Sequence, residues 1–343
     1  MDVDLGFADK PEDAGWLVNR YFPSKLGGLP AWLELKELPT TTQLQCKKCQ
    51  AQKAFLCQLY ADYEDDFNFH RTVYVFMCRN ADCQQANRAD NFTVLRSQLP
   101  RSNKFYSEEE PSDDVLLPAI ESPRKLCAAC GCLAPHSCSR CKIISYCCAA
   151  HQRAHWPQHK PDCGTTKVST TCRPLPDLVF AEYEINMEHN LEEDDTHEKD
   201  EQARMSEFIA LSEAGKTGEL SDVPENELEK YFDGASSQED KVFQQFKKQT
   251  AAKPDQIVRY ERGGQPLWIA NTKDTIEAQL QAIPNCSKCD GPRQFEFQIM
   301  PQVLSLLGDS VLDWGVLAVY TCARSCRIEG YVEEYLVKQD IVA

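Results

Sequence analysis

The chain has no long hydrophobic run and no surplus of basic residues. Its longest strongly apolar stretch, Gly315 to Tyr320, is far too short to cross a bilayer. Asp and Glu number 53 against 37 Lys and Arg, which gives a formal net charge of −16. Proteins bind DNA and acidic membranes through Lys and Arg that meet phosphate. The charge therefore argues against DNA and membranes as partners and favours a basic protein.

The chain also lacks the usual signatures of secretion and of catalysis. Its first residues, MDVDLGFADK, are acidic and have no apolar core of the kind found in signal peptides. No G-x-S-x-G, H-E-x-x-H or phosphate-binding loop motif occurs in it. We therefore expect a protein of the cytoplasm and nucleus without enzymatic activity. Its 343 residues are enough for two or three domains.

Cysteine, by contrast, is abundant, with 18 residues. In a reducing compartment, thiols in such number are better explained as metal ligands than as disulfides. Isolated cysteines need another explanation, because they have no second ligand nearby in the sequence. We interpret Cys57 and Cys172 as small buried hydrophobic residues.

The segment 127–163 concentrates cysteine and histidine at the spacing of zinc ligands. Four ligands make one tetrahedral zinc site, so four ligand pairs predict two zinc ions. The last two pairs have helical spacing, which places both ligands of a pair on one helix face. The spacing leaves open whether the pairs combine sequentially or in an interleaved way. The pairs are Cys127 with Cys130, Cys138 with Cys141, Cys147 with His151, and His159 with Cys163.

A second pattern occurs twice, once on each side of this segment. GGLPAW at 27–32 and GGQPLW at 263–268 are each followed by C-x2-C, by alternating apolar segments and by two further cysteines. The alternation predicts strands, and cysteine pairs at strand tips are typical of a zinc ribbon. We predict one zinc ion per repeat. The expected ligands are Cys46, Cys49, Cys78 and Cys83 in the first repeat, and Cys286, Cys289, Cys322 and Cys326 in the second.

These patterns predict a β-rich α+β fold. Each repeat alone has little core and exposed edges, so we expect the two zinc-ribbon-like repeats to pair in one body, with the Cys-rich segment inserted on flexible arms. Three independent units are the alternative. The expected parts are an N-terminal repeat (1–106), an acidic linker (107–126), a zinc finger (127–164), a connector (165–187), an acidic disordered linker (188–235) and a C-terminal repeat (236–343).

Two elements are expected beside the repeats. LVFAEYEINM at 178–187 alternates apolar and polar residues and predicts a strand in the connector. SQEDKVFQQFKKQ at 237–249 predicts a helix that Ser236 or Ser237 caps and that ends before Pro254. The apolar face of this helix, with Phe246, should pack against the second repeat.

The Cys-rich segment resembles a MYND zinc finger. This resemblance implies interleaved sites, with Cys127, Cys130, Cys147 and His151 on one zinc ion and Cys138, Cys141, His159 and Cys163 on the other. Together with one zinc ion in each repeat, the expected total is four. His151 stands where most MYND fingers have cysteine. Four residues remain outside this scheme: Cys132, His136, Cys148 and His155.

MYND fingers usually bind proline-containing peptides. Gln152 and Trp156 match the residues that form the peptide groove of that family, although Trp156 could instead serve only to pack a small module. The basic residues of the segment are too few for a DNA-reading surface. MYND fingers also occur in some lysine methyltransferases, but the chain lacks the cofactor-binding motifs of that class.

Longer motifs resemble the programmed cell death protein 2 family. They include FPSKLGGLPAWL at 22–33, DKVFQQFKKQ at 240–249 and DWGVLAVYTC at 313–322. The resemblance implies a dedicated chaperone that captures one newly made, basic small-subunit ribosomal protein, the homologue of the bacterial S-five protein, in small ribosomal subunit production. The alternative is a nuclear adaptor that recruits corepressors through proline-rich peptides, with a role in cell death or proliferation.

Overall fold

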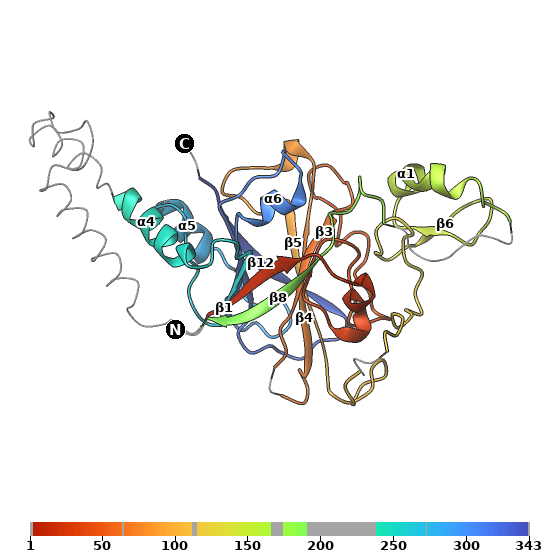
Figure 1. Ribbon diagram of the computed structural model, residues 1–343, viewed down its shortest axis with the longest axis horizontal. Helices are drawn as coiled ribbons and strands as arrows, with labels where there is room; N and C mark the ends of the chain where they lie inside the picture. Colours follow the sequence, from red (N-terminus) through yellow and green to blue (C-terminus); the bar gives the residue numbers. More distant parts are fainter. Residues whose placement is uncertain are drawn as a thin grey trace, which may run out of the picture.

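The computed structural model describes residues 3–63, 65–111, 115–165, 174–190, 238–271 and 273–341. Its main element is a closed barrel of antiparallel strands in the order β1-β8-β2-β3-β4-β5-β12-β11-β10-β9 (Figure 1). These strands are β1 (Val3–Asp9), β2 (Lys25–Leu26), β3 (Ala54–Tyr60), β4 (His70–Met77), β5 (Phe92–Leu99), β8 (Tyr183–Asn190), β9 (Val258–Tyr260), β10 (Arg293–Ile299), β11 (Val316–Cys322) and β12 (Tyr331–Gln339).

The helices are short, and all but α6 (Val303–Leu307), which adds Val303 and Leu307 to the barrel core, lie outside the barrel. In Figure 1, α1 (Ala149–His159) and β6 (His136–Ser137) lie on one side of the barrel, and α4 (Gln238–Ala251) and α5 (Lys273–Gln281) lie on the other. None of the helices in the described ranges is long and apolar enough to span a membrane. The remaining elements are η1 (Ala14–Leu17), η2 (Asn19–Tyr21), η3 (Ala81–Cys83) and β7 (Ser145–Tyr146).

The prediction of an α+β fold built from two zinc-ribbon-like repeats is wrong. The strands of both repeats belong to one mostly β barrel, and β5 pairs with β12 from Tyr331↔Ser97 to Glu334↔Val94. A few strands per repeat cannot bury their apolar face alone, and an open sheet leaves hydrogen-bonding edges exposed. Closure of the sheet on itself provides one common interior and removes most of these edges.

The two repeats retain matching local geometry inside the barrel. The Gln58 side chain on β3 accepts a hydrogen bond from the Ala31 N–H at 2.9 Å, and Gln298 on β10 accepts one from the Leu267 N–H at 2.6 Å. Ala31 and Leu267 occupy the same position in the two GG-x-P-x-W motifs. β3 and β10 each have a register shift just before the glutamine. The repeated motif therefore fixes an equivalent loop against each half of the barrel.

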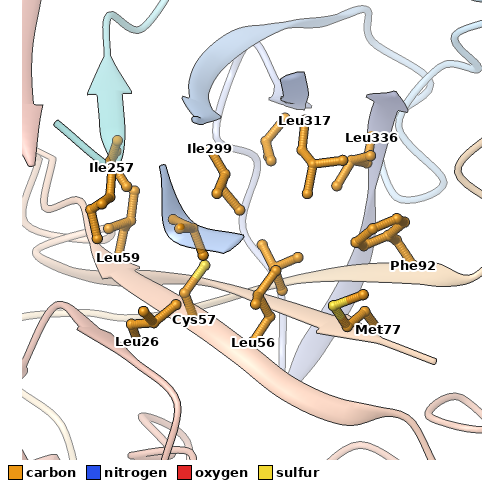
Figure 2. Packing of buried hydrophobic residues seen from close by; sticks show 14 of the residues in the cluster. Leu26, Leu56, Cys57, Leu59, Met77, Phe92, Ile257, Ile299, Leu317 and Leu336 are labelled. Carbon is orange, nitrogen blue, oxygen red and sulfur yellow. The ribbon is translucent and has the colours of Figure 1, made fainter. Parts of the chain in front are cut away.

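One part of the barrel interior is an apolar core. Leu56 and Leu59 of β3 point into it, together with Ile299 of β10, Leu317 of β11 and Leu336 of β12 (Figure 2). Removal of these side chains from water is the main driving force for closure. Cys57 lies in the same cluster and is 1% exposed, as expected for a small hydrophobic residue, whereas Cys172 lies outside the described residues.

Another part of the interior is charged. The guanidinium of Arg71 on β4 forms a two-pronged ion pair with Glu296 on β10, with Nη2 2.7 Å from Oε2, and both side chains are fully buried. Arg96 on β5 donates through Nε to Glu334 on β12 at 2.7 Å. Arg293 donates to the second oxygen of Glu334 at 2.8 Å. The pairs of Arg71 and Arg96 tie strands of the first repeat to strands of the second.

The Cys-rich segment is not held on flexible arms. Trp32 donates through Nε1 to the Gly131 carbonyl at 2.8 Å, and one buried cluster joins Trp32, Tyr74 and Phe76 to the finger residues Ala129 and Tyr146. The preceding linker is also partly ordered against the barrel. Asn19 exchanges two hydrogen bonds with the backbone of Ile120, at 3.0 and 2.9 Å.

Several expected boundaries shift. The connector strand begins at Tyr183, not at Leu178, and continues to Asn190. The helix α4 ends at Ala251, before Pro254, and buries Phe246. Its proposed cap at Ser236 or Ser237 lies outside the described residues. Most of the expected acidic linker, from residue 191 onward, also lies outside them.

Candidate metal centres

The finger builds two ligand clusters around one helix. Cys147 ends the short hairpin of β6 and β7, and α1 follows almost at once, so His151 on its first turn faces back toward Cys147. His151 Nδ1 lies 3.2 Å from Cys147 Sγ and 3.7 Å from Cys127 Sγ. Cys130 Sγ lies 3.8 Å from Cys147 Sγ. The first cluster therefore joins the first ligand pair to the third.

The second cluster joins the second pair to the fourth. His159, at the end of α1, places Nε2 3.5 Å from Cys141 Sγ, and Cys138 Sγ lies 3.9 Å from Cys163 Sγ. In each cluster the four ligand atoms lie within 4.8 Å of one another. The structure thus brings the eight residues together in the interleaved grouping. Seven of the eight ligands are buried, so the clusters lie at the centre of the module.

Two further clusters lie beside the barrel, one for each repeat. The first contains Cys46, Cys49, Cys78 and Cys83, and the second contains Cys286, Cys289, Cys322 and Cys326. Their sulfur–sulfur separations agree closely, with 3.7 Å for Cys46–Cys83 and 3.5 Å for Cys49–Cys78 in one, and 3.7 Å for Cys286–Cys326 and 3.6 Å for Cys289–Cys322 in the other.

The turn that carries each C-x2-C pair is the same in the two repeats. The Gln50 N–H donates to the Cys46 carbonyl, and the Asp290 N–H donates to the Cys286 carbonyl, both at 2.9 Å. Gln50 and Asp290 have positive φ values of 62° and 53°. This tight turn brings both thiols of the pair to one point, which is the geometry that a single metal ion requires.

The surroundings of the first thiol in these turns favour the thiolate. Burial alone raises the pKa of Cys46, but the backbone N–H groups of Cys49 and Lys48 and the neighbouring thiols outweigh it and lower this pKa to about 7. The same balance lowers the pKa of Cys286 to about 7. Thiolate is the form that binds metal.

The separations within all four clusters match a tetrahedral zinc site. A Zn–S bond of about 2.3 Å places two sulfur ligands of a tetrahedron about 3.8 Å apart. Thiolate and imidazole ligands select zinc or iron–sulfur clusters over magnesium or calcium. Because each cluster supplies four protein ligands, a bound zinc ion would have no open position for substrate. The clusters are therefore suited to a structural role.

The finger residues outside the clusters have other surroundings. Cys132 is buried, and its thiol lies 3.8 Å from the Cys130 carbonyl. His155 is buried, with Nδ1 3.0 Å from the Tyr146 hydroxyl. Cys148 is half-buried and precedes α1, and His136 is exposed on β6.

Two residues of the first repeat hold the cluster of the second, and the sequence reasoning missed them. Arg96 and Gln98 on β5 donate to the Cys326 carbonyl at 3.2 and 3.1 Å, and Arg96 Nη2 lies 3.9 Å from Cys326 Sγ. The signal in the sequence that could have identified Arg96 is its charge at an inward-facing position of a β-strand, between Val94 and Gln98. Its partners are more than 200 residues away, so the sequence could not identify them.

The two residues matched to a peptide groove lie beside each other on the finger surface. Gln152 and Trp156 are one helical turn apart on α1 and line a hollow of about 300 Å³. Trp156 is half-buried and contacts His159 edge to face at 5.8 Å. The hollow therefore adjoins the second metal cluster. Its other lining residues are Cys138, Ser139, Arg140 and Arg153.

A MYND finger docked on a β-barrel that carries two additional cysteine clusters defines a class of zinc-finger proteins. Family models match this chain in three places: the programmed cell death protein 2 N-terminal domain at residues 2–113, the MYND finger at 127–163 and the programmed cell death protein 2 C-terminal putative domain at 240–340. The chain belongs to the programmed cell death protein 2 family, which confirms the resemblance seen in its motifs.

Curated relatives match over nearly the full length. Programmed cell death protein 2 of Mus musculus is 42% identical over 99% of this chain and 96% of that protein. Programmed cell death protein 2-like of Homo sapiens is 28% identical over 92% of this chain and 90% of its own. A Schizosaccharomyces pombe relative, named probable 20S rRNA accumulation protein 4, is 24% identical over 95% of this chain and 91% of its own. No solved structure gives a significant match.

Proposed function

We propose that the protein is a non-enzymatic chaperone that captures a basic small-subunit ribosomal protein, the homologue of bacterial S-five, and thereby supports small ribosomal subunit production. The observation that carries this proposal is the full-length similarity to a yeast relative whose name refers to accumulation of 20S rRNA. A protein that holds one component of a subunit can affect the level of an rRNA without touching RNA itself. The protein would act in the cytoplasm and nucleus.

Charge supports a basic client. The net charge of −16 disfavours contact with rRNA phosphates and favours a protein rich in Lys and Arg. Complementary charge speeds the encounter of two proteins and suppresses wrong partners. Because ribosomal proteins carry high positive charge before assembly, an acidic escort would shield them from non-specific binding to nucleic acid.

We also propose that four zinc ions, one per cluster, serve to hold this fold. Zinc sites with four protein ligands are structural. Arg96 and Gln98 would then act on the second barrel site by orienting the loop of Cys326. Damage to a barrel site should therefore abolish client capture through loss of the fold.

The proposal is tested by purifying the tagged full chain from cytosol at low salt and identifying stoichiometric partners. We expect a single free small-subunit ribosomal protein, without the remainder of the subunit, and its recovery should fall as salt rises, because charge attraction is screened. Recovery of no ribosomal protein above background would refute the chaperone. Recovery that is independent of salt would refute the electrostatic part alone.

A second candidate is an adaptor that binds proline-rich peptides of corepressors through the hollow at Gln152 and Trp156. The hollow is the specific observation that favours it. Trp156→Ala separates the two functions, because it should remove peptide binding by the finger yet leave ribosomal-protein capture close to wild type. A loss of ribosomal-protein capture in Trp156→Ala, with all metal retained, would favour the finger as the client site.

A further inference from the structure

The strand β8 has neighbours on both sides for only part of its length. β1 pairs with it from Val3↔Asn190 to Asp9↔Glu184, whereas β2 pairs with it only at Tyr183 and Glu184. The last backbone contact on the β2 side is the Ile185 N–H, which donates to the Ser24 carbonyl at 2.9 Å. Among the described residues, no strand continues β2 beside residues 186–190, and we call this the open edge of β8.

The backbone groups on this open edge can be identified. In an antiparallel ladder, the N–H and C=O of one residue point to the same side, and successive residues alternate. The Ile185 N–H points away from β1, so the N–H and C=O groups of Met187 and His189 point away from β1 as well. Groups on a sheet edge that no described strand pairs are a template for an added strand.

The side chains along this edge do not block such pairing. Edge strands are usually protected by lysine, proline or a bulge. β8 contains no lysine, no proline and no register shift. Met187 is 38% exposed, although it lies on the same strand face as the buried Ile185. An apolar side chain is thus presented beside these backbone groups.

Carboxylates outnumber lysines around this edge. The strands β1 and β8 carry the acidic residues Asp4, Asp9, Glu184 and Glu188 and no lysine or arginine. Asp9 lies directly opposite Glu184, and like charges in that position are destabilising. Glu188 forms an ion pair with Lys253 of the neighbouring loop at 2.7 Å. On the other side of β8, Lys25 of β2 lies opposite Glu184 but is ion-paired with Glu182, so Glu184 can still attract a lysine or arginine of a partner.

We propose that the open edge of β8 is a docking site for an extended, basic segment of a partner polypeptide, which pairs with the backbone of Met187 and His189. Apolar side chains of the segment would lie on the face of Met187, and alternate lysines or arginines would lie on the face of Glu184. This inference rests on the proposed chaperone function and deepens it by naming the surface and the kind of client segment it takes. The acidic side chains exclude nucleic acid and acidic lipid as occupants.

The first test uses two synthetic peptides with the full-length protein. One is an eight-residue peptide of alternating lysine and valine, and the other has the same sequence with every backbone amide N-methylated, so that its charge is kept and both strand edges are lost. We expect the unmodified peptide to bind and to slow hydrogen exchange of the Met187 and His189 amides at least tenfold. The methylated peptide should bind at least tenfold more weakly.

Two results would overturn the inference. Equal binding of the two peptides would mean that charge alone holds them, and binding without protection of the Met187 and His189 amides would place the peptide elsewhere. Failure of the unmodified peptide to bind would also refute it. In each case, ribosomal-protein capture from cytosol is measured separately, so the proposed function can stand while the docking surface fails.

A matched pair of variants provides an independent test. Met187→Pro removes the outward N–H without touching the ladder to β1, and Met187→Leu retains that N–H with a similar apolar side chain. We expect Met187→Pro to lower peptide binding at least tenfold and Met187→Leu to leave it unchanged. Equal capture by the two folded variants would exclude backbone pairing at this edge. If Met187→Pro fails to fold, the exchange measurement on the unmodified protein decides.

Discussion

Trp32 in the barrel donates its indole N–H to the Gly131 carbonyl in the finger at 2.8 Å, and this contact fixes the finger to the barrel. The same ring stacks on Phe76 at 5.8 Å and meets Tyr331 edge to face at 5.2 Å, so it touches strands from both repeats. The equivalent residue of the second repeat, Trp268, packs instead with Ile276 of α5. The tryptophan of the repeated GG-x-P-x-W motif thus contacts the finger in the first repeat and α5 in the second.

Substitution at Trp32 should release the finger. Trp32→Ala removes a 2% exposed ring and should cost about 3–5 kcal/mol of unfolding free energy. Trp32→Phe preserves part of the ring contact but leaves the Gly131 carbonyl unpaired, at about 1–3 kcal/mol. Chemical denaturation measures both. Trp156→Phe, on the outer face of α1, is the matched control and should change stability little.

The ion pair of Arg71 and Glu296 should make stability depend on acid pH. Burial raises the pKa of Glu296, but the charge and hydrogen bonds of Arg71 outweigh it and lower this pKa from 4.5 to about 2. A carboxyl group with a lowered folded-state pKa contributes stability that is complete above about pH 4.5 and is lost as the pH falls toward 2.

Glu296→Gln isolates this contribution, because thiolate ligands also become protonated in acid. The variant should be less stable by about 3–5 kcal/mol at neutral pH, since Arg71 then lacks its buried partner. The difference from wild type should shrink as the pH is lowered below 4.5. Urea titrations across that range measure it, with the exposed Glu329→Gln as control. A difference that is constant with pH would contradict the assigned pKa.

Native mass spectrometry should show four zinc ions in the purified chain. Cys147→Ser and Cys322→Ser should each reduce the number by one, because each removes a ligand of one cluster. Each structural zinc ion can contribute on the order of 10 kcal/mol of folding free energy, so Cys322→Ser should also unfold near room temperature. Cys132→Ser, outside every cluster, should retain four ions. A wild-type protein with two would show that the barrel clusters bind none.

Arg96 should determine how tightly the second barrel cluster holds its metal. Arg96→Met removes donors to the Cys326 carbonyl and should weaken zinc binding there about 10–100-fold, as is usual for residues that orient ligands. Labelling with a maleimide during chelator treatment reports the two clusters separately. Cys289 should become reactive faster in the variant, whereas Cys49 in the first cluster, its matched control, should not. Equal acceleration of both would indicate general unfolding.

The sequence by itself determined the local parts of this protein. Cysteine and histidine pairs are recognisable because their spacing places two ligands on one turn or one helix face, as at Cys147 and His151. The repeated GG-x-P-x-W and C-x2-C motifs are recognisable because each is a short run of residues at fixed spacing. The alternation of apolar and polar residues also predicts strands, although the predicted bounds of β8 were wrong by several residues.

Only the tertiary structure decided how these parts combine. Alternation shows that a strand has an inner face but not which strand closes the sheet, so two zinc-ribbon-like repeats paired in one body were expected where the strands of both close one barrel. Arg71 and Glu296 stand 225 residues apart, and nothing local to either predicts the other. Trp32 and Gly131 stand 99 residues apart, and their hydrogen bond holds the finger against the barrel, where a flexible insertion was expected. These contacts depend on which surfaces close packing brings together, and that information lies in no single segment of the chain.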